Sequence, residues 1–209
     1  VLAAGGNAIE AALAVGSTLS VVYPHMNSLG GDGFWLLSDQ RGNLTGLDGA
    51  GPAGKLYDLG FYADQGLEAI PTRGPHAANT VAGLVSVWGA AHAFSRTHWG
   101  GRVSWRDLFE PALGHAADGF ACSASQGDFL AQKWTELGGF DTLTGIYAPD
   151  GKPAPAGAVF RQPQLAESLR LHNQIWNAGV RAALANGGVV NDHHGVGLKL
   201  GHLMKEQYG

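Results

Sequence analysis

A short glycine-rich turn followed at once by a β-hairpin pattern is the feature that most constrains this chain. Gly30-Gly31-Asp32-Gly33 precedes the apolar run Phe34–Ser38, and a polar turn at Asp39–Asn43 separates this run from Leu44–Leu47. Apolar runs of this length, bounded by turn residues, predict the two strands of a hairpin. Because glycines let backbones approach closely, we expect the preceding helix to return tightly onto the first strand.

The same glycines raise the alternative of a loop that cradles an anion with successive backbone N–H groups. Residues 30–33 lack both the Lys-Ser/Thr ending of a phosphate-binding loop and the GxGxxG spacing of a dinucleotide-binding turn. The structural interpretation of the turn is therefore favoured over nucleotide binding.

Helix signals surround this hairpin. Asn7 followed by Glu10 resembles a capping box, and the Ala, Val and Leu residues of Ala8–Leu19 predict a buried helix. Ser104 with Asp107 is a second capping signal. Further helices are predicted at Asn79–Ser95, from Pro111 to Gly119, at Ser123–Leu137 and at Gln164–Asn186. Residues 50–76, rich in Gly and Pro, are expected to be an irregular surface segment.

Charge and cysteine content narrow the class of function. The 13 Lys and Arg and 17 Asp and Glu residues are dispersed and leave a net charge of −4, which argues against a nucleic-acid or anionic-membrane partner. No apolar run approaches the roughly 20 residues of a membrane span, and no basic segment opens the chain, so a cytoplasmic enzyme of small molecules is expected. Cys122 is the lone cysteine, which favours a buried filler over a nucleophile. Val1–Gly6 begins inside a helix-turn signal, so an upstream piece is expected.

Six collinear segments carry a family resemblance: GGNAIEAALAV, VVYPHMNSLGGDGFWLL, TGLDGAGPAG, VAGLVSVW, PALGHAADGF and QPQLAESL. In order and spacing they resemble the large subunit of the γ-glutamyltranspeptidase family, over residues 1–171. The resemblance implies an α+β fold, the αββα sandwich of N-terminal-nucleophile hydrolases, cut autocatalytically into two subunits. It also implies a hetero-oligomer, because the nucleophile of such enzymes is the N-terminal Thr of a separate small subunit. No Thr-headed segment is visible here, so no nucleophile, cofactor or metal is assigned to this chain.

One departure from the family pattern bears on the substrate. Glutamyl-specific members of the family carry an Arg after the returning strand, whose guanidinium can fork onto a substrate carboxylate. Here Ala50 stands at about that place, which predicts a smaller amide acid. The GGDGFW and PHMNS segments look most like the oxamate amidohydrolase branch, which hydrolyses oxamate to oxalate and ammonia. The pocket candidates under this resemblance are His25, Asn27, Asp48 and Ala50.

Residues 172–209 have a different resemblance and are treated as a separate helical tail. The glycine pair and His193-His194-Gly195-Val196-Gly197, followed by a Lys-bearing helix pattern, resemble the C-terminal cap of FAD-linked oxidases. His193 and His194 would then lie beside a flavin, yet the nucleotide-binding domain of that family is missing from this sequence. The alternatives left open are therefore an FAD-linked oxidase fragment and a non-catalytic composite fragment. A metal site from these histidines and His202 is disfavoured, because adjacent histidines point in different directions.

Overall fold

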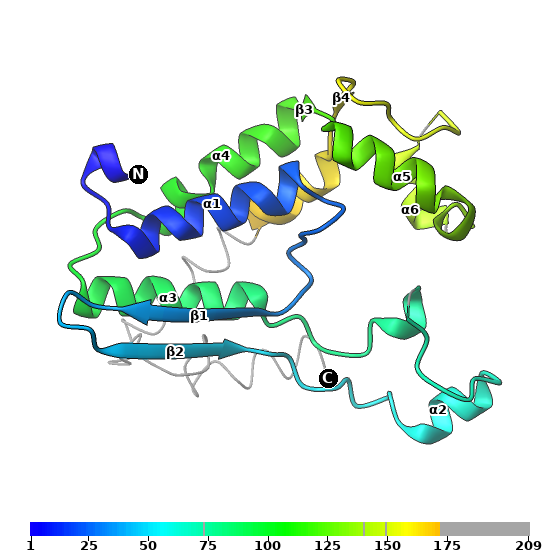
Figure 1. The fold of residues 1–209 in the computed structure, drawn as a ribbon, viewed down its shortest axis with the longest axis horizontal. Coiled ribbons are helices and arrows are strands. Elements are labelled where there is room, and N and C mark those ends of the chain that lie inside the picture. Colours follow the sequence, from blue (N-terminus) through cyan, green and yellow to red (C-terminus); the bar gives the residue numbers. More distant parts are fainter. Residues whose placement is uncertain (73, 140, 149, 172–209) are drawn as a thin grey trace.

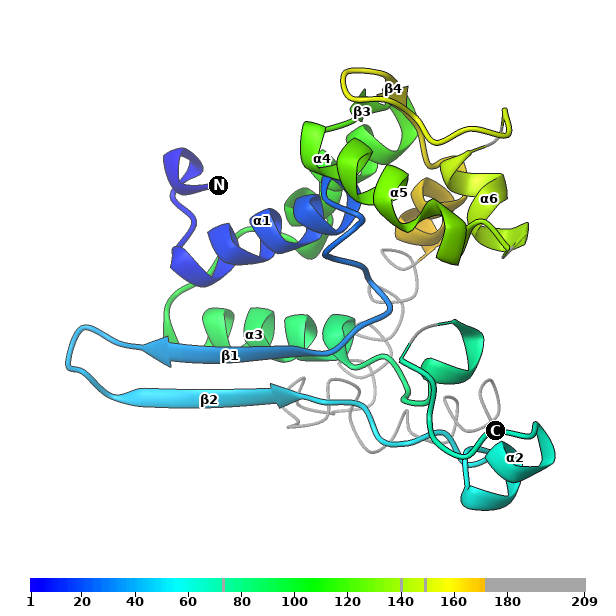
Figure 2. The same cartoon turned by 45° about the vertical axis from the view of Figure 1, so that its right-hand side comes forward.

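The computed structural model describes residues 1–72, 74–139, 141–148 and 150–171. The predicted tail at 172–209, with His193, His194 and the FAD-linked alternative, lies outside the described residues. Within them the chain mixes helices with two antiparallel sheets of two strands each, β1–β2 and β3–β4, so the expected α+β class is confirmed. Figure 1 shows the long helices on one side of the hairpin, and Figure 2 shows the same arrangement turned by 45°.

The first long helix begins where its capping box predicted. A short 3-10 helix, η1 (Leu2–Ala4), precedes α1 (Ala8–Val22). Asn7 Oδ1 accepts a hydrogen bond from the N–H of Glu10 at 3.1 Å, and Glu10 Oε2 accepts one from the N–H of Asn7 at 2.9 Å. The predicted burial of α1 holds for one face only, because Val15 and Leu19 on the other face remain exposed.

The predicted hairpin is also present. Strand β1 (Gly33–Ser38) pairs antiparallel with β2 (Leu44–Gly49), with Phe34 opposite Asp48. At the turn, Asp39 Oδ1 accepts hydrogen bonds from the N–H groups of Arg41 and Asn43 at 2.8 and 2.9 Å. Close packing is seen at Gly33, where a Cβ would meet Leu84, but Leu84 belongs to a later helix and not to the preceding one, and Gly30 has open space around it.

Helix α3 (Leu84–His98) lies between α1 and the hairpin and covers one face of the two strands (Figure 1). The predicted start of this helix at Asn79 was wrong. Residues 79–81 instead pair with residues 52–54, through an isolated bridge between Ala53 and Thr80 and a hydrogen bond from the N–H of Gly54 to the carbonyl of Asn79. Helical spacing in the sequence could not reveal this competition for the same backbone groups.

Helix α4 (Trp105–Asp118) packs along α1. Its start at Pro111 was wrongly predicted, because Ser104 Oγ caps the N–H of Asp107 at 3.1 Å and the helix runs straight through Pro111. Gly119 ends the helix as expected, with a φ of 103° that suits glycine. The buried core between these elements is apolar and contains Ile9, Leu13, Val21, Leu37, Val87, Trp88, Ala91, Leu108, Phe109 and Ala112.

The remaining elements form two groups, one above the other in Figure 1. Strands β3 (Phe120–Ala121) and β4 (Val159–Phe160) pair beside α5 (Ala124–Leu137) and α6 (Asp141–Tyr147). The predicted helix at Ser123–Leu137 is confirmed, with Ser123 as its cap, and the last predicted helix begins at residue 163 and is described as far as 171. The segment expected to be irregular contains α2 (Leu59–Asp64) and is followed by η2 (Pro75–Ala77), and it extends away from the helices as an arm (Figures 1 and 2).

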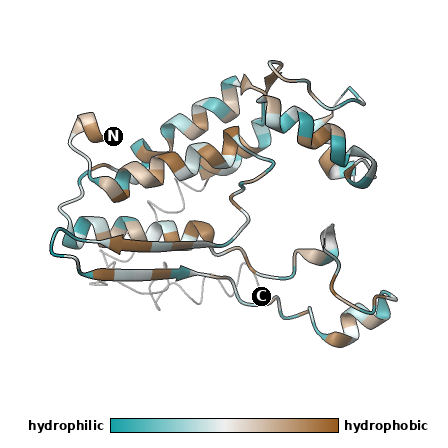
Figure 3. Ribbon diagram, in the orientation of Figure 1, coloured by the Kyte–Doolittle hydropathy of each residue, from teal (hydrophilic) through white to brown (hydrophobic). Residues whose placement is uncertain are grey.

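The hairpin face that points away from α3 is open and apolar. Phe34, Leu36 and Leu44 on this face are 71%, 77% and 68% exposed. Figure 3 shows that β1 is largely apolar, although only one of its faces is covered by α3. A sheet face of this kind normally packs against another layer of a protein.

Candidate active site

Two carboxylates hold the backbone just after the end of β2. Asp48 Oδ1 accepts a hydrogen bond from the N–H of Ala50 at 2.8 Å, and Asp32 Oδ1 accepts one from the N–H of Gly51 at 3.0 Å. Asp32 belongs to the turn before β1, so the two predicted pocket residues Asp48 and Ala50 are tied to the glycine turn. We call residues 48–52 together with Asp32 the hairpin corner.

The other side of the hairpin corner is packed against backbone. The N–H of Val81 donates to the carbonyl of Pro52 at 2.9 Å, and the N–H of Leu84 donates to the carbonyl of Gly31 at 2.9 Å. A Cβ at Gly51 would overlap the carbonyl of Val81, and a Cβ at Gly83 would overlap the carbonyl of Gly49. Only glycine at 51 and 83 permits the two segments to cross this closely.

The other two predicted pocket residues lie in the loop that follows α1. The His25 ring lies 4.2 Å from the Tyr23 ring and 5.7 Å from the Phe129 ring, measured between centroids. Both of its ring nitrogens are covered and have no hydrogen-bond partner among the residues that the structure describes, and burial lowers the pKa of His25 below its usual range. The neutral imidazole is therefore favoured. The side chain of Asn27 is exposed, and its N–H donates to the carbonyl of Tyr23 at 3.0 Å.

The structure thus brings the four predicted residues together only in pairs. Among the described residues, no hydrogen bond or ring contact links His25 or Asn27 to Asp48 or Ala50. The sequence did not single out Gly51 and Val81. The carbonyl of Val81 lies where a side chain at position 51 would be, so only glycine fits there. No local signal marks that contact, because the two residues are far apart in the sequence.

Cys122 is buried, as the sequence predicted. Burial raises the pKa of its thiol, so the protonated, weakly nucleophilic form is favoured. Its Sγ lies 3.6 Å from the carbonyl oxygen of Ala154. Among the described residues, no three His, Cys, Asp or Glu side chains are grouped closely enough to hold a metal ion.

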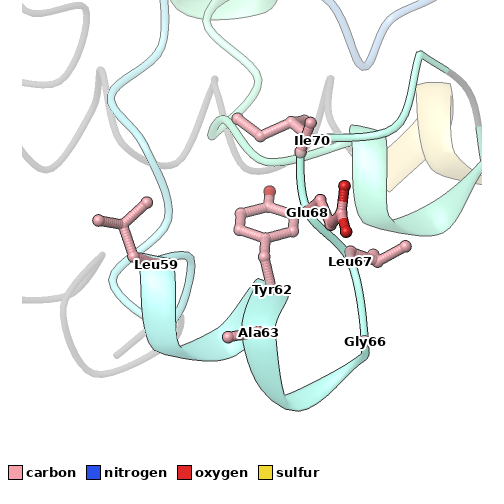
Figure 4. A pocket seen from close by; sticks show the side chains of 8 residues that line it. Leu59, Tyr62, Ala63, Gly66, Leu67, Glu68 and Ile70 are labelled. Carbon is pink, nitrogen blue, oxygen red and sulfur yellow. The ribbon is translucent and has the colours of Figure 1, made fainter.

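A cavity of about 750 Å³ lies on the arm, away from the predicted pocket residues (Figure 4). Its lining comes entirely from residues 59–70, including Leu59, Tyr62 and Glu68. Tyr62 donates a hydrogen bond to the carbonyl of His76 at 3.2 Å, which fixes this ring within the arm. Because one local segment supplies every wall, the cavity is a surface feature of the arm and contains none of the groups that the resemblance points to.

Comparison with known proteins identifies the family. A family model described as gamma-glutamyltranspeptidase matches residues 1–187, so the chain belongs to the γ-glutamyltranspeptidase family. It is 43% identical over 171 residues to the oxamate amidohydrolase proenzyme of Klebsiella pneumoniae, a match that covers 82% of this chain and 32% of that protein. It is 32% identical over 175 residues to the glutathione hydrolase proenzyme of Escherichia coli, covering 82% of this chain and 29% of that protein.

Solved structures of the same family have the same fold. The γ-glutamyltranspeptidase of Helicobacter pylori matches with a TM-score of 0.73 and 26% identity, over 84% of this chain and 50% of that chain. The enzyme from Pseudomonas nitroreducens matches with a TM-score of 0.68 and 31% identity, over 83% of this chain and 49% of that chain. The predicted N-terminal-nucleophile hydrolase fold is therefore confirmed, as is membership of a family of amide-cleaving hydrolases.

Two further findings concern the extent of the chain and its relation to membranes. The chain spans about a third of the length of the curated relatives it matches, 32% for the Klebsiella protein and 31% for the Bacillus subtilis glutathione hydrolase-like proenzyme. Within the part of the chain that the structure describes, each helix is too short or too polar to cross a bilayer. The predicted boundary between residues 1–171 and 172–209 stays a prediction, as do the roles of the site residues.

Proposed function

We propose that this chain is the large subunit of an amide hydrolase that acts on a small amide acid such as oxamate, with the nucleophilic Thr on a separate small subunit. The observation behind this substrate class is Ala50, because its methyl group supplies no cation to bind the carboxylate of a glutamyl substrate. The 43% identity to an oxamate amidohydrolase proenzyme supports the same choice. The proenzyme names of the relatives support the division into two subunits.

The proposed reaction divides amide hydrolysis into two steps. The Thr hydroxyl attacks the amide carbonyl while the α-amine of the same Thr accepts the hydroxyl proton, and ammonia leaves as the C–N bond breaks. Water then cleaves the resulting ester, which releases the diacid and restores the Thr. Backbone N–H groups aimed at the developing oxyanion would lower both barriers. This scheme uses no cofactor and no metal ion.

In this proposal the large subunit provides one wall of the pocket. Asp48 and Ala50 lie on the hairpin corner, whose backbone is fixed by hydrogen bonds on both sides. His25 and Asn27 are the second pair of candidates, and the exposed Asn27 side chain offers an amide that can donate or accept a hydrogen bond. A wall with a fixed backbone and a short side chain at 50 suits a small substrate.

The partner is proposed to cover the open face of the hairpin. Phe34, Leu36 and Leu44 expose apolar side chains on the side away from α3, and within the described residues the sheet of β1 and β2 has no third strand. A small subunit that adds strands and a second sheet would bury these side chains and extend the sheet. The isolated chain is then expected to be poorly soluble, and a monodisperse stable monomer would contradict this. No nucleic-acid or membrane partner is proposed, and the cytoplasmic location stays a prediction.

The test is to purify the assembled protein and measure its products and its composition. We expect ammonia and oxalate from oxamate, and an intact-mass spectrum with a second chain that begins with Thr. Turnover of γ-glutamyl-p-nitroanilide without activity on oxamate would overturn the substrate. A spectrum that contains this chain alone would overturn the two-subunit enzyme.

A further inference from the structure

The side chain of Asp32 connects the glycine turn to the backbone after β2 through a hydrogen bond. Its Oδ1 lies 3.0 Å from the N–H nitrogen of Gly51, and Asp48 Oδ1 lies 2.8 Å from that of the adjacent Ala50. Two successive backbone N–H groups therefore point at carboxylates from two different segments, the turn before β1 and the end of β2. Hydrogen bonds to ionised acceptors are stronger than neutral ones, so this pair restricts rotation of the backbone at 50 and 51.

The turn that carries Asp32 is itself anchored. The carbonyl of Gly31 accepts the N–H of Leu84 at 2.9 Å, which ties the turn to the first residue of α3. The carbonyl of Val81 also lies against Gly51, and the carbonyl of Pro52 accepts the N–H of Val81. Residues 50–52 are thus held both by Asp32 and by the segment around Val81.

We propose that Asp32 is a positioning residue that fixes residues 50–52 as a rigid wall and so restricts the substrate to short acyl groups. The inference rests on the proposed function, in which this wall lines the amide pocket. Without the Asp32 hydrogen bond, the hairpin corner keeps its contact with Val81 but loses one of its anchors. The backbone at residues 50 and 51 then has more freedom to move. A longer acyl group then gains room, while a short one loses the contact surface that orients it.

Two substitutions at Asp32 and one matched control test this role in the assembled enzyme. Asp32→Ala removes the acceptor, whereas Asp32→Asn keeps an oxygen in its place. Asp39→Ala is the control, because Asp39 also accepts backbone N–H bonds, at the far end of the same hairpin. The measurement is the ratio of kcat/KM for oxamate to kcat/KM for succinamate, which has two more methylene groups. This ratio does not depend on how much of the enzyme is folded.

We expect Asp32→Ala to lower the ratio about tenfold, and Asp32→Asn and Asp39→Ala to leave it within about twofold. An unchanged ratio in Asp32→Ala, or an equal fall in Asp39→Ala, would overturn the role of Asp32. Hydrogen exchange at Gly51 provides a readout that needs no activity, and exchange should accelerate in Asp32→Ala but much less in Asp32→Asn. If the wild type hydrolyses neither oxamate nor succinamate, the proposed function fails. Equal hydrogen exchange at Gly51 in the wild type, Asp32→Ala and Asp32→Asn would reject the positioning role by itself.

Discussion

Glu10 Oε1 accepts a hydrogen bond from the N–H of Val103 at 2.8 Å and so ties the start of α1 to the loop that follows α3. The Glu10 side chain is fully buried, and its second oxygen completes the capping box with Asn7. Asn7 Nδ2 extends the network by donating to Ser95 Oγ at 2.7 Å. The helix cap is thereby joined to two other parts of the structure, to Val103 through the buried Glu10 carboxylate and to Ser95 through the Asn7 amide.

The first prediction concerns this carboxylate. Glu10→Gln keeps the shape of the side chain but replaces one acceptor oxygen with an NH₂ group, which must then face a backbone N–H. We expect a loss of about 2 kcal/mol in the free energy of unfolding, because a buried donor is left without an acceptor. Urea denaturation measures this loss. The matched control is Glu110→Gln on the exposed side of α4, which should change stability by less than about 0.5 kcal/mol; similar losses in both variants would contradict the prediction.

The second prediction is a dependence of stability on pH that comes from His92. Its Nε2 lies 3.0 Å from the carbonyl oxygen of Val103, and burial is the main cause of a pKa below the usual 6.5. Because the unfolded chain takes up the proton first, the contribution of neutral His92 is complete above about pH 6.5 and is lost as the pH falls through that value. We expect the chain to lose about 1 kcal/mol from this group between pH 7.5 and 5.5.

His92→Gln isolates this contribution, since a glutamine amide can still donate to the carbonyl of Val103 but does not titrate. Chemical denaturation at the two pH values should show a smaller difference in the variant than in the wild type. Part of the dependence should remain, because burial also lowers the pKa of His25. An identical difference in both proteins would show that His92 does not contribute.

The third prediction concerns the crossing at the hairpin corner. Gly51→Ala places a methyl group on the carbonyl of Val81, which is backbone and cannot turn aside. We expect a loss of about 2 to 3 kcal/mol in the free energy of unfolding from this overpacking. Gly46→Ala is the control, since its added Cβ would lie 4.0 Å from its nearest neighbour, the carbonyl oxygen of Trp35. Thermal denaturation of both variants gives the comparison, and a Gly51→Ala protein as stable as Gly46→Ala would refute the prediction.

The fourth prediction tests the open hairpin face. Leu36→Glu should leave the stability of the chain itself within about 0.5 kcal/mol, because the side chain is 77% exposed. The same change should weaken association with the proposed small subunit at least roughly tenfold, since it puts a charge into an apolar interface. Leu56→Glu, at an equally exposed position on the arm, is the control. Titration of the small subunit followed by light scattering measures both, and equal affinity of the two variants would argue for a different interface.

The sequence predicted the elements that depend on neighbouring residues. The Asn7 and Glu10 capping box, the hairpin turn at Asp39–Asn43 and the Ser123 cap each involve groups within four positions of one another. Their hydrogen bonds form from local geometry alone, so residue type and spacing suffice to find them. The six family segments added the fold class, because their order and spacing reflect one known architecture.

Only the tertiary structure decided the features that depend on distant backbone. The predicted helix did not start at Asn79, because residues 79–81 pair with residues 52–54. Glu10 was visible as a capping residue, whereas its bond to Val103 spans 93 positions. Nothing in the sequence near Gly51 indicates that the carbonyl of Val81 packs against it and excludes a side chain there. Local signals determined the helix caps and the hairpin turn, because the partners are close in sequence, whereas the approach of distant segments determined where α3 begins and which backbone groups meet at the hairpin corner.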